Sequence, residues 1–436
     1  MTRHTRMLAA ALMVALLAPG GCDTADTSRP SSTAADPSAA PTGGSSPSNA
    51  ATNDGAASQP ATSGSTASQS ATATADASSP PAEGGELAPV SELDPVANGS
   101  FVSPLVERFG DVRIGRGSFV AGNSTLRADP EAAVCLGSES NVQDNVLILA
   151  LLGESHTHGP GECAELAAES GDRTSLAHQA VVTNSTIGDF AFIGFRVEIR
   201  DAVVEDGAFI LHGAFIEGVT IPADSLVAIG QRVTTQEQAD ALPKLTEDNN
   251  EFKQEVLEVN AEFAEGYIEL FEDGGHEAVT GVSAGPQTEW NPNPAEPTLG
   301  ENVRLEPFAR IVGDVRLGAD SSVGRRTSIR ADEGAPIDIG PQAEIEDFVT
   351  FHALRGTSLT VGSDLNTDDN VVFHGPLTVG ERLTIGDDAI LFRSEVGNNV
   401  TIGERAIVVG VTLPDGTTVP EDAAITTQGQ VDALID

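Results

Sequence analysis

Residues 379–403 read VGERLTIGDDAILFRSEVGNNVTIG. An aliphatic residue followed by Gly recurs six residues apart at Val396-Gly397 and Ile402-Gly403, and again in the first half of the chain at Ile187-Gly188 and Ile193-Gly194. Such a period, with one buried aliphatic side chain per unit, is typical of a hexapeptide β-helix, in which each unit forms one short strand and three units form one coil. The sequence therefore predicts a β fold, a left-handed parallel β-helix with a core of Val, Ile, Leu and Ala.

The composition agrees with this fold and limits the function. Only 4% of the 436 residues are aromatic, with one Trp and one Tyr, whereas hydrophobic residues reach 39% and there are 45 Gly. The net charge of −42 repels phosphate backbones and anionic lipid headgroups. We therefore expect no nucleic-acid partner and no electrostatic docking to a membrane.

The β-helix pattern occurs twice on a larger scale. The segment Thr234–Leu242 has a close counterpart in Thr426–Leu434, and Gly218–Pro222 has one in Gly410–Pro414. Because both pairs are offset by the same number of residues, the chain contains two copies of one unit. This duplication predicts two tandem β-helix domains.

The expected boundaries follow from where the pattern stops. The first β-helix and a connecting helix occupy 96–272, a linker covers 273–295, and the second β-helix covers 296–436. The helix is expected over 246–271, where apolar residues recur near helical spacing.

The N-terminal part has a different composition. Two Arg precede an apolar run at Met7–Ala18, which is too short to span a bilayer and resembles a signal peptide over residues 1–21. Small residues before Cys22 resemble a bacterial lipobox, so we expect export and a lipid anchor as the membrane attachment. Residues 22–95 are rich in Ser, Thr, Ala and Pro and are predicted to form a disordered tether.

Several short blocks resemble the gamma-class carbonic anhydrases. They are Ser328–Gly334 (SIRADEG) and Phe351–Leu354 (FHAL) in the second copy and Ser175–Gln179 (SLAHQ) in the first. The resemblance implies a trimeric assembly of β-helices with zinc between subunits, and the hydration of CO₂ to bicarbonate by a metal-bound hydroxide. In this family, two zinc histidines come from one subunit and the third from its neighbour.

The two copies retain different parts of the ligand set that this resemblance implies. The second copy has His352 and His374 at the positions of the paired histidines, where the first copy has Leu149 and Thr183. Neither copy therefore has the complete family site by itself.

The remaining ligand position shows the opposite loss. The first copy keeps His178 there, whereas the second copy has Asp369. Pairing unlike copies gives His178, His352 and His374, the three-nitrogen set of a catalytic zinc site, which Fe²⁺ or Co²⁺ would also accept. If like copies paired instead, His352 and His374 would be joined by Asp369. We favour the mixed arrangement, in a homo-oligomer or a pseudo-trimer of β-helix domains.

The same resemblance implies catalytic roles for three further residues. Gln143 would orient the hydroxide or bicarbonate, and Glu333 would carry the proton. Asn260 lies in the expected helix at a family active-site position. Arg330 and Asp332, with counterparts Arg127 and Asp129 in the first copy, resemble the family's inter-subunit pairs.

Two other functions stay open from the sequence alone. One is a metal-free β-helix that serves as a cell-surface binding or assembly scaffold. It is supported by the loss of histidine at Leu149, Thr183 and Asp369. A hexapeptide acyltransferase is supported only by the repeat. Metal content would separate the enzyme from the scaffold. In the first copy, His156 and His158 lie in a polar loop and suggest a proton shuttle, a second metal site or a solvated surface. A disulfide between Cys135 and Cys163 is possible but not predicted.

Overall fold

The computed structural model describes residues 88–89, 95–152 and 167–435. The signal peptide, Cys22 and almost all of the tether lie outside the described residues. So do His156, His158 and Cys163. Cys135 is disulfide-bonded, and both other cysteines of the chain fall outside the described parts.

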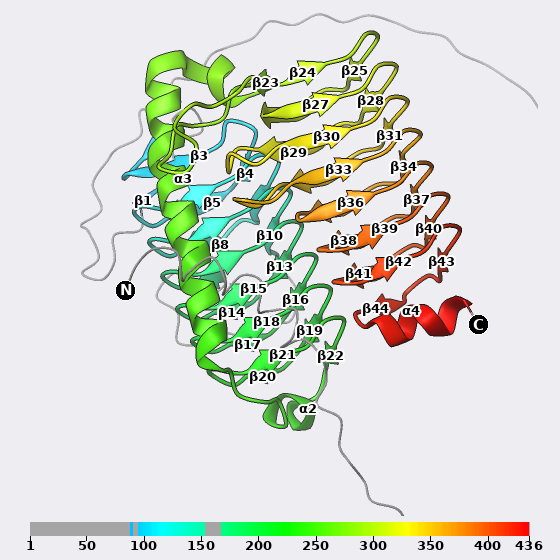
Figure 1. Cartoon of the computed structure of the whole chain (residues 1–436). Helices are drawn as coiled ribbons and strands as arrows, with labels where there is room; N and C mark the ends of the chain where they lie inside the picture. Colours follow the sequence, from blue (N-terminus) through cyan, green and yellow to red (C-terminus); the bar gives the residue numbers. More distant parts are fainter. Residues whose placement is uncertain (1–87, 90–94, 153–166, 436) are drawn as a thin grey trace, which may run out of the picture. The chain divides into compact units, whose positions relative to one another are not determined.

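The strands form six sheets that make two parallel β-helices (Figure 1). The first runs from β1 (Ala88–Pro89) to β22 (Arg232–Val233), in sheets of seven, seven and eight strands. The second runs from β23 (Val282–Ser283) to β44 (Ala424–Ile425), in sheets of eight, seven and seven. Apart from two antiparallel pairs at the start of the first β-helix, the paired strands are parallel. The predicted fold class is confirmed.

Each β-helix encloses its own column of aliphatic side chains. Val396 and Ile402, the residues that revealed the repeat, are 5% and 1% exposed inside the second column. The Gly of each unit is needed where successive coils stack closely. At Gly324, for example, a Cβ atom would lie 2.3 Å from the carbonyl carbon of Glu346 in the next coil.

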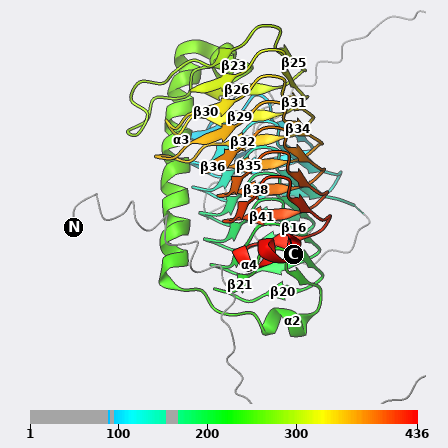
Figure 2. The same cartoon turned by 45° about the vertical axis from the view of Figure 1, so that its right-hand side comes forward.

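Helix α3 (Glu247–Val279) returns the chain to the start of the stack. Its 33 residues span about 50 Å, enough to pass along seven or eight coils that are each roughly 4.8 Å thick. Both β-helices therefore run in the same direction, as Figures 1 and 2 show from two sides. The helix continues past the expected end at Phe271, although Gly275 interrupts it with a φ of +67°. The first part of the expected linker is thus helical.

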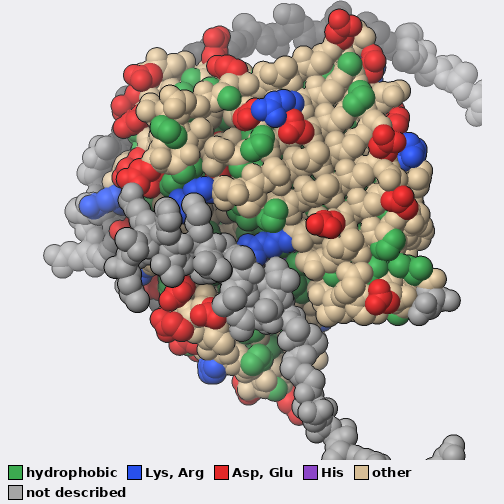
Figure 3. Space-filling view, viewed as in Figure 1, with side chains coloured by type: hydrophobic (Ala, Val, Ile, Leu, Met, Phe, Trp, Pro, Cys, Tyr) green, Lys and Arg blue, Asp and Glu red, His purple; other side chains and the backbone are tan. Residues whose placement is uncertain are grey.

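Two shorter helices, α2 (Gln236–Asp240) and α4 (Gln428–Ile435), follow the last coil of each β-helix. Within the described part of the chain, no helix combines the length and the apolar character needed to cross a membrane. Acidic side chains are scattered over the face that Figure 3 displays, in line with the charge of the sequence.

The two β-helices contact each other through unlike surfaces. Turns of the first β-helix pack against a sheet of the second: Gln179 donates to the carbonyl oxygen of Phe348, and Arg196 pairs with Asp388 at 2.7 Å. An apolar cluster lies across the same junction and includes Phe195 from the first β-helix and Phe392 from the second. The junction therefore brings the side chains of the two copies together within one chain.

Candidate metal centre

Two histidines stand side by side on one sheet of the second β-helix. They end the strands β32 (Thr350–His352) and β35 (Val372–His374), which are parallel and in register, so that His352 lies beside His374. Both point outward from the aliphatic core but are only 3% and 4% exposed, because the first β-helix covers them.

The first β-helix contributes the third histidine. His178 lies in the turn after β12 (Ser175–Leu176) and is fully buried. His178 Nε2 lies 3.2 Å from His352 Nδ1, which lies 3.2 Å from His374 Nε2. Nitrogens bound to a tetrahedral zinc ion at 2.0–2.1 Å are separated by about 3.3–3.4 Å. The spacing therefore fits one metal ion.

Burial favours the neutral form of two of these imidazoles, His178 and His374. It lowers the pKa of His178 to about 4, although Asp144 opposes the shift, and it lowers the pKa of His374 well below its ordinary value. Neutral imidazole is the form that binds a metal. At neutral pH, His178 and His374 can therefore each offer a ring-nitrogen lone pair to a metal ion.

The second nitrogen of each ring faces an oxygen atom. His178 Nδ1 lies 3.3 Å from a carboxylate oxygen of Asp144, and His352 Nε2 lies 3.5 Å from one of Glu333. His374 Nδ1 lies 3.4 Å from the carbonyl oxygen of Gly375. Acceptors behind metal-binding imidazoles fix the ring orientation and the tautomer.

Asp144 joins the cluster to the junction between the β-helices. It accepts from Arg330 at 2.6 Å and from Ser328 at 2.7 Å, both in the second copy. Burial opposes its charge, but Arg330 and His178 hold its pKa well below the usual range. Arg330 also binds Asp332 at 2.9 Å. Asp144 was not among the predicted site residues. The sequence hints at its importance only through its position next to Gln143.

The other three expected site residues, Glu333, Gln143 and Asn260, differ in how they relate to the histidines. Glu333 is 6% exposed, burial raises its pKa, and it accepts from the backbone N–H of Arg355. Gln143 precedes Asp144 in the same turn, and its Oε1 is buried without a hydrogen-bond donor among the described residues. Asn260 donates to the Val256 carbonyl within α3, and among the described contacts none joins it to the histidines.

The equivalent positions outside the junction do not form a second cluster in the described structure. Leu149 and Thr183 are adjacent on neighbouring strands of the first β-helix and are half-buried. Asp369 is exposed on the second β-helix, where it accepts from the backbone N–H of Asp347. Among the described residues, the His, Cys, Asp and Glu side chains that could hold a metal together are His178, His352 and His374.

A fourth histidine, His212, packs against Phe195, the aromatic side chain that contacts the cluster. His212 stacks on Phe195 with ring centroids 4.2 Å apart, and its Nδ1 accepts from the Phe195 backbone N–H. Phe195 in turn packs against His374 at 4.6 Å. A Cβ at Gly194 would lie 2.9 Å from His212 Nδ1, so glycine is needed there.

We expect His212 to make the stability of the protein depend on pH. Burial lowers the pKa of His212 to about 3. As the pH falls below about 6.5, His212 is therefore protonated in the unfolded chain but stays neutral in the folded protein. This contribution is fully present above pH 6.5 and is lost as the pH falls, by about 2 kcal/mol at pH 5. Denaturant unfolding at pH 7 and pH 5 measures it. His212→Asn keeps an acceptor for Phe195 without a titrating group, and an unchanged pH slope in this variant would contradict the assignment.

Comparisons with known proteins agree with the geometry. The chain is 32% identical over 172 residues to the carbonic anhydrase of Methanosarcina thermophila, covering 35% of this chain and 70% of that protein. It is 31% identical over 153 residues to gamma carbonic anhydrase 1, mitochondrial, of Arabidopsis thaliana, covering 35% of this chain and 51% of that protein. It is also 36% identical over 164 residues to the carboxysome assembly protein CcmM of Nostoc sp., covering 35% of this chain but only 30% of that protein.

No protein-family model matches the chain. The carbonic anhydrase of Methanosarcina thermophila nevertheless aligns over more than two thirds of its own length at 32% identity. The chain belongs to the gamma-class carbonic anhydrase family.

Proposed function

We propose that this protein catalyses the reversible hydration of CO₂ to bicarbonate at a metal ion held by His178, His352 and His374. The observation that carries the proposal is three buried histidine side chains whose nitrogens lie within 4.8 Å of one another across the junction of the two β-helices. A divalent ion bound there, with zinc as the first choice, would supply Lewis-acid activation of water near neutral pH.

The surrounding side chains suit this reaction. Asp144 holds the His178 ring from behind, and Phe195 and Phe392 give the cluster an apolar side next to His374. Glu333 lies at the cluster with its pKa raised by burial, which brings it closer to the pH at which a general acid or base exchanges protons. We assign proton transfer to Glu333 and the orientation of bicarbonate to Gln143.

The assembly and the location belong to the same proposal. We infer an exported, lipid-anchored bacterial protein in which one chain supplies two β-helices of a pseudo-trimer. The unlike pairing that the sequence favours is supported by the distance of 3.2 Å between His178 and His352 within one chain.

We expect protein purified without chelators to contain about one metal ion per chain and to accelerate CO₂ hydration in a stopped-flow assay. Metal content measured together with the rate tests the proposal. An assembly scaffold is the second candidate, because the similarity to CcmM is as strong in identity as that to the enzymes. A metal-free, inactive but folded protein would favour the scaffold.

A further inference from the structure

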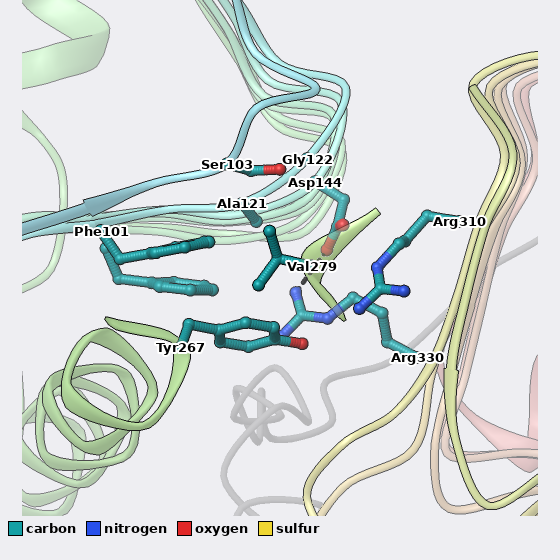
Figure 4. Close-up of a pocket in the computed structure, with 10 residues that line it drawn as sticks. Phe101, Ser103, Ala121, Gly122, Asp144, Tyr267, Val279, Arg310 and Arg330 are labelled. Carbon is teal, nitrogen blue, oxygen red and sulfur yellow. Dashed lines mark hydrogen bonds and ion pairs between the residues drawn. The ribbon is translucent and has the colours of Figure 1, made fainter. Parts of the chain in front are cut away.

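A small buried cavity lies behind the metal centre, between the two β-helices and α3 (Figure 4). The volume open to the centre of a water molecule is about 20 Å³, and about 10–15 Å³ is enough for one water. Its polar lining comes from Ser103, Asp144, Tyr267, Arg310 and Arg330. The cavity therefore has room for one small molecule or ion.

Arg310 is the unusual member of this lining. It is only 4% exposed, and its Nη1 donates to Ser283 at 2.8 Å and to the carbonyl oxygen of Gly281. Its Nη2 is buried and meets no acceptor in hydrogen-bond geometry, and no described carboxylate lies within 4.0 Å of the guanidinium. Burial lowers the pKa of Arg310, although the nearby Tyr267 and Asp332 oppose that shift. A buried charged donor that meets no acceptor is costly.

The acidic groups around the cavity are already engaged elsewhere. Asp144 accepts from Arg330 and Ser328, and Asp332 accepts from Arg330 and from the Tyr267 hydroxyl at 2.6 Å. Asp332 supplies a nearby negative charge to Arg310 but no hydrogen-bond acceptor for its Nη2. The Ser103 hydroxyl accepts from the Leu105 backbone N–H, and its own proton has no acceptor among the described residues. Both Ser103 and Arg310 thus retain a donor.

We infer that this cavity is a binding site for one small monovalent anion, of the size of chloride or bicarbonate, held by Arg310 Nη2 and the Ser103 hydroxyl. The anion gives Arg310 Nη2 the acceptor that the described residues do not supply, and charge-assisted hydrogen bonds of this kind are strong. Arg330 offsets the repulsion from Asp144, which lines the same cavity. The site is distinct from the histidine cluster and does not depend on the proposed catalytic activity.

Thermal unfolding of the full chain tests the site. Tm is measured in gluconate and again after chloride or bicarbonate has replaced it at the same ionic strength. Gluconate is too large for the cavity and serves as the reference anion. Constant ionic strength keeps the screening of the −42 net charge the same. We expect either small anion to raise Tm by about 2 °C or more at saturating concentration. The anion that acts at the lower concentration identifies the preferred ligand. No difference from gluconate would overturn the site and assign the cavity to water.

Variants locate the effect. Arg310→Met should abolish the anion-dependent rise, and Ser103→Ala should shift it to several-fold higher anion concentration. Arg304→Met removes an equal charge at an exposed position and should keep the full rise. His374→Ala removes a metal ligand away from the cavity and should also keep it. A rise that survives in Arg310→Met, or that disappears in His374→Ala, would place the anion elsewhere.

Discussion

In the His178→Ala variant we expect stoichiometric metal binding to be lost, together with CO₂ hydration. Among the described residues of the first β-helix, His178 alone contributes a nitrogen to the cluster, 3.2 Å from His352. Removing residues that merely orient metal ligands costs 10–100-fold in affinity, so the loss of a ligand should exceed about 100-fold. Titration with zinc against a competing chelator measures this change.

Asp369→Ala is the matched control, because Asp369 is the counterpart of His178 in the second copy. It is exposed and bonded to Asp347, so its removal should leave metal content unchanged. If Asp369→Ala lost the metal and His178→Ala kept it, like copies would pair between chains and the cluster within the chain would not be the functional site. Retention in both variants would show that the metal lies elsewhere.

Replacing Arg330 by Met should strongly destabilise the metal-free protein. Arg330 is 4% exposed and binds both Asp144 and Asp332, which are 1% and 0% exposed in the same network. Without it, two carboxylates remain buried without their cation, and breaking a buried ion pair in this way costs about 3–5 kcal/mol. Denaturant unfolding gives the change in the free energy of unfolding. We also expect metal affinity to fall about 10–100-fold, since Asp144 supports His178.

The first copy again offers the matched control. Arg127 occupies the equivalent place and pairs with Asp129, but its side chain is 53% exposed. Arg127→Met should unfold at the same denaturant concentration as the wild type, because exposed pairs contribute little. Equal losses in the two variants would mean that the junction between the β-helices does not depend on the buried network.

The repeat made the fold predictable, and the resemblance to the gamma-class carbonic anhydrases made the ligands of the cluster predictable. A six-residue period specifies which side chains point into the core, and the complementary losses at Leu149 and Asp369 indicated that unlike copies pair. His178, His352 and His374 follow from the positions that the family resemblance implies, and the structure brings them together.

The contacts across the junction were not predictable in the same way. Asp144 and Arg330 are far apart in the sequence, and nothing in either repeat shows that they meet. Their contact depends on the relative placement of the two β-helices, which α3 and the packing of Phe195 against Phe392 help to determine. The unpaired Nη2 of Arg310 arises from the same placement, since the residues around it come from three separate segments.

The direction of the chain through α3 also bears on how the sequence can evolve. Because both β-helices run the same way, an edge of one meets a sheet of the other, and each equivalent position lies once inside the junction and once outside it. In a symmetric ring of identical subunits, every substitution is repeated at every interface. Here the duplication breaks that symmetry. Leu149 and Asp369 stand where the family has histidines, at positions outside the junction, and the cluster inside the junction is unaffected. A substitution in one copy can therefore change a surface outside the junction without changing the metal ligands.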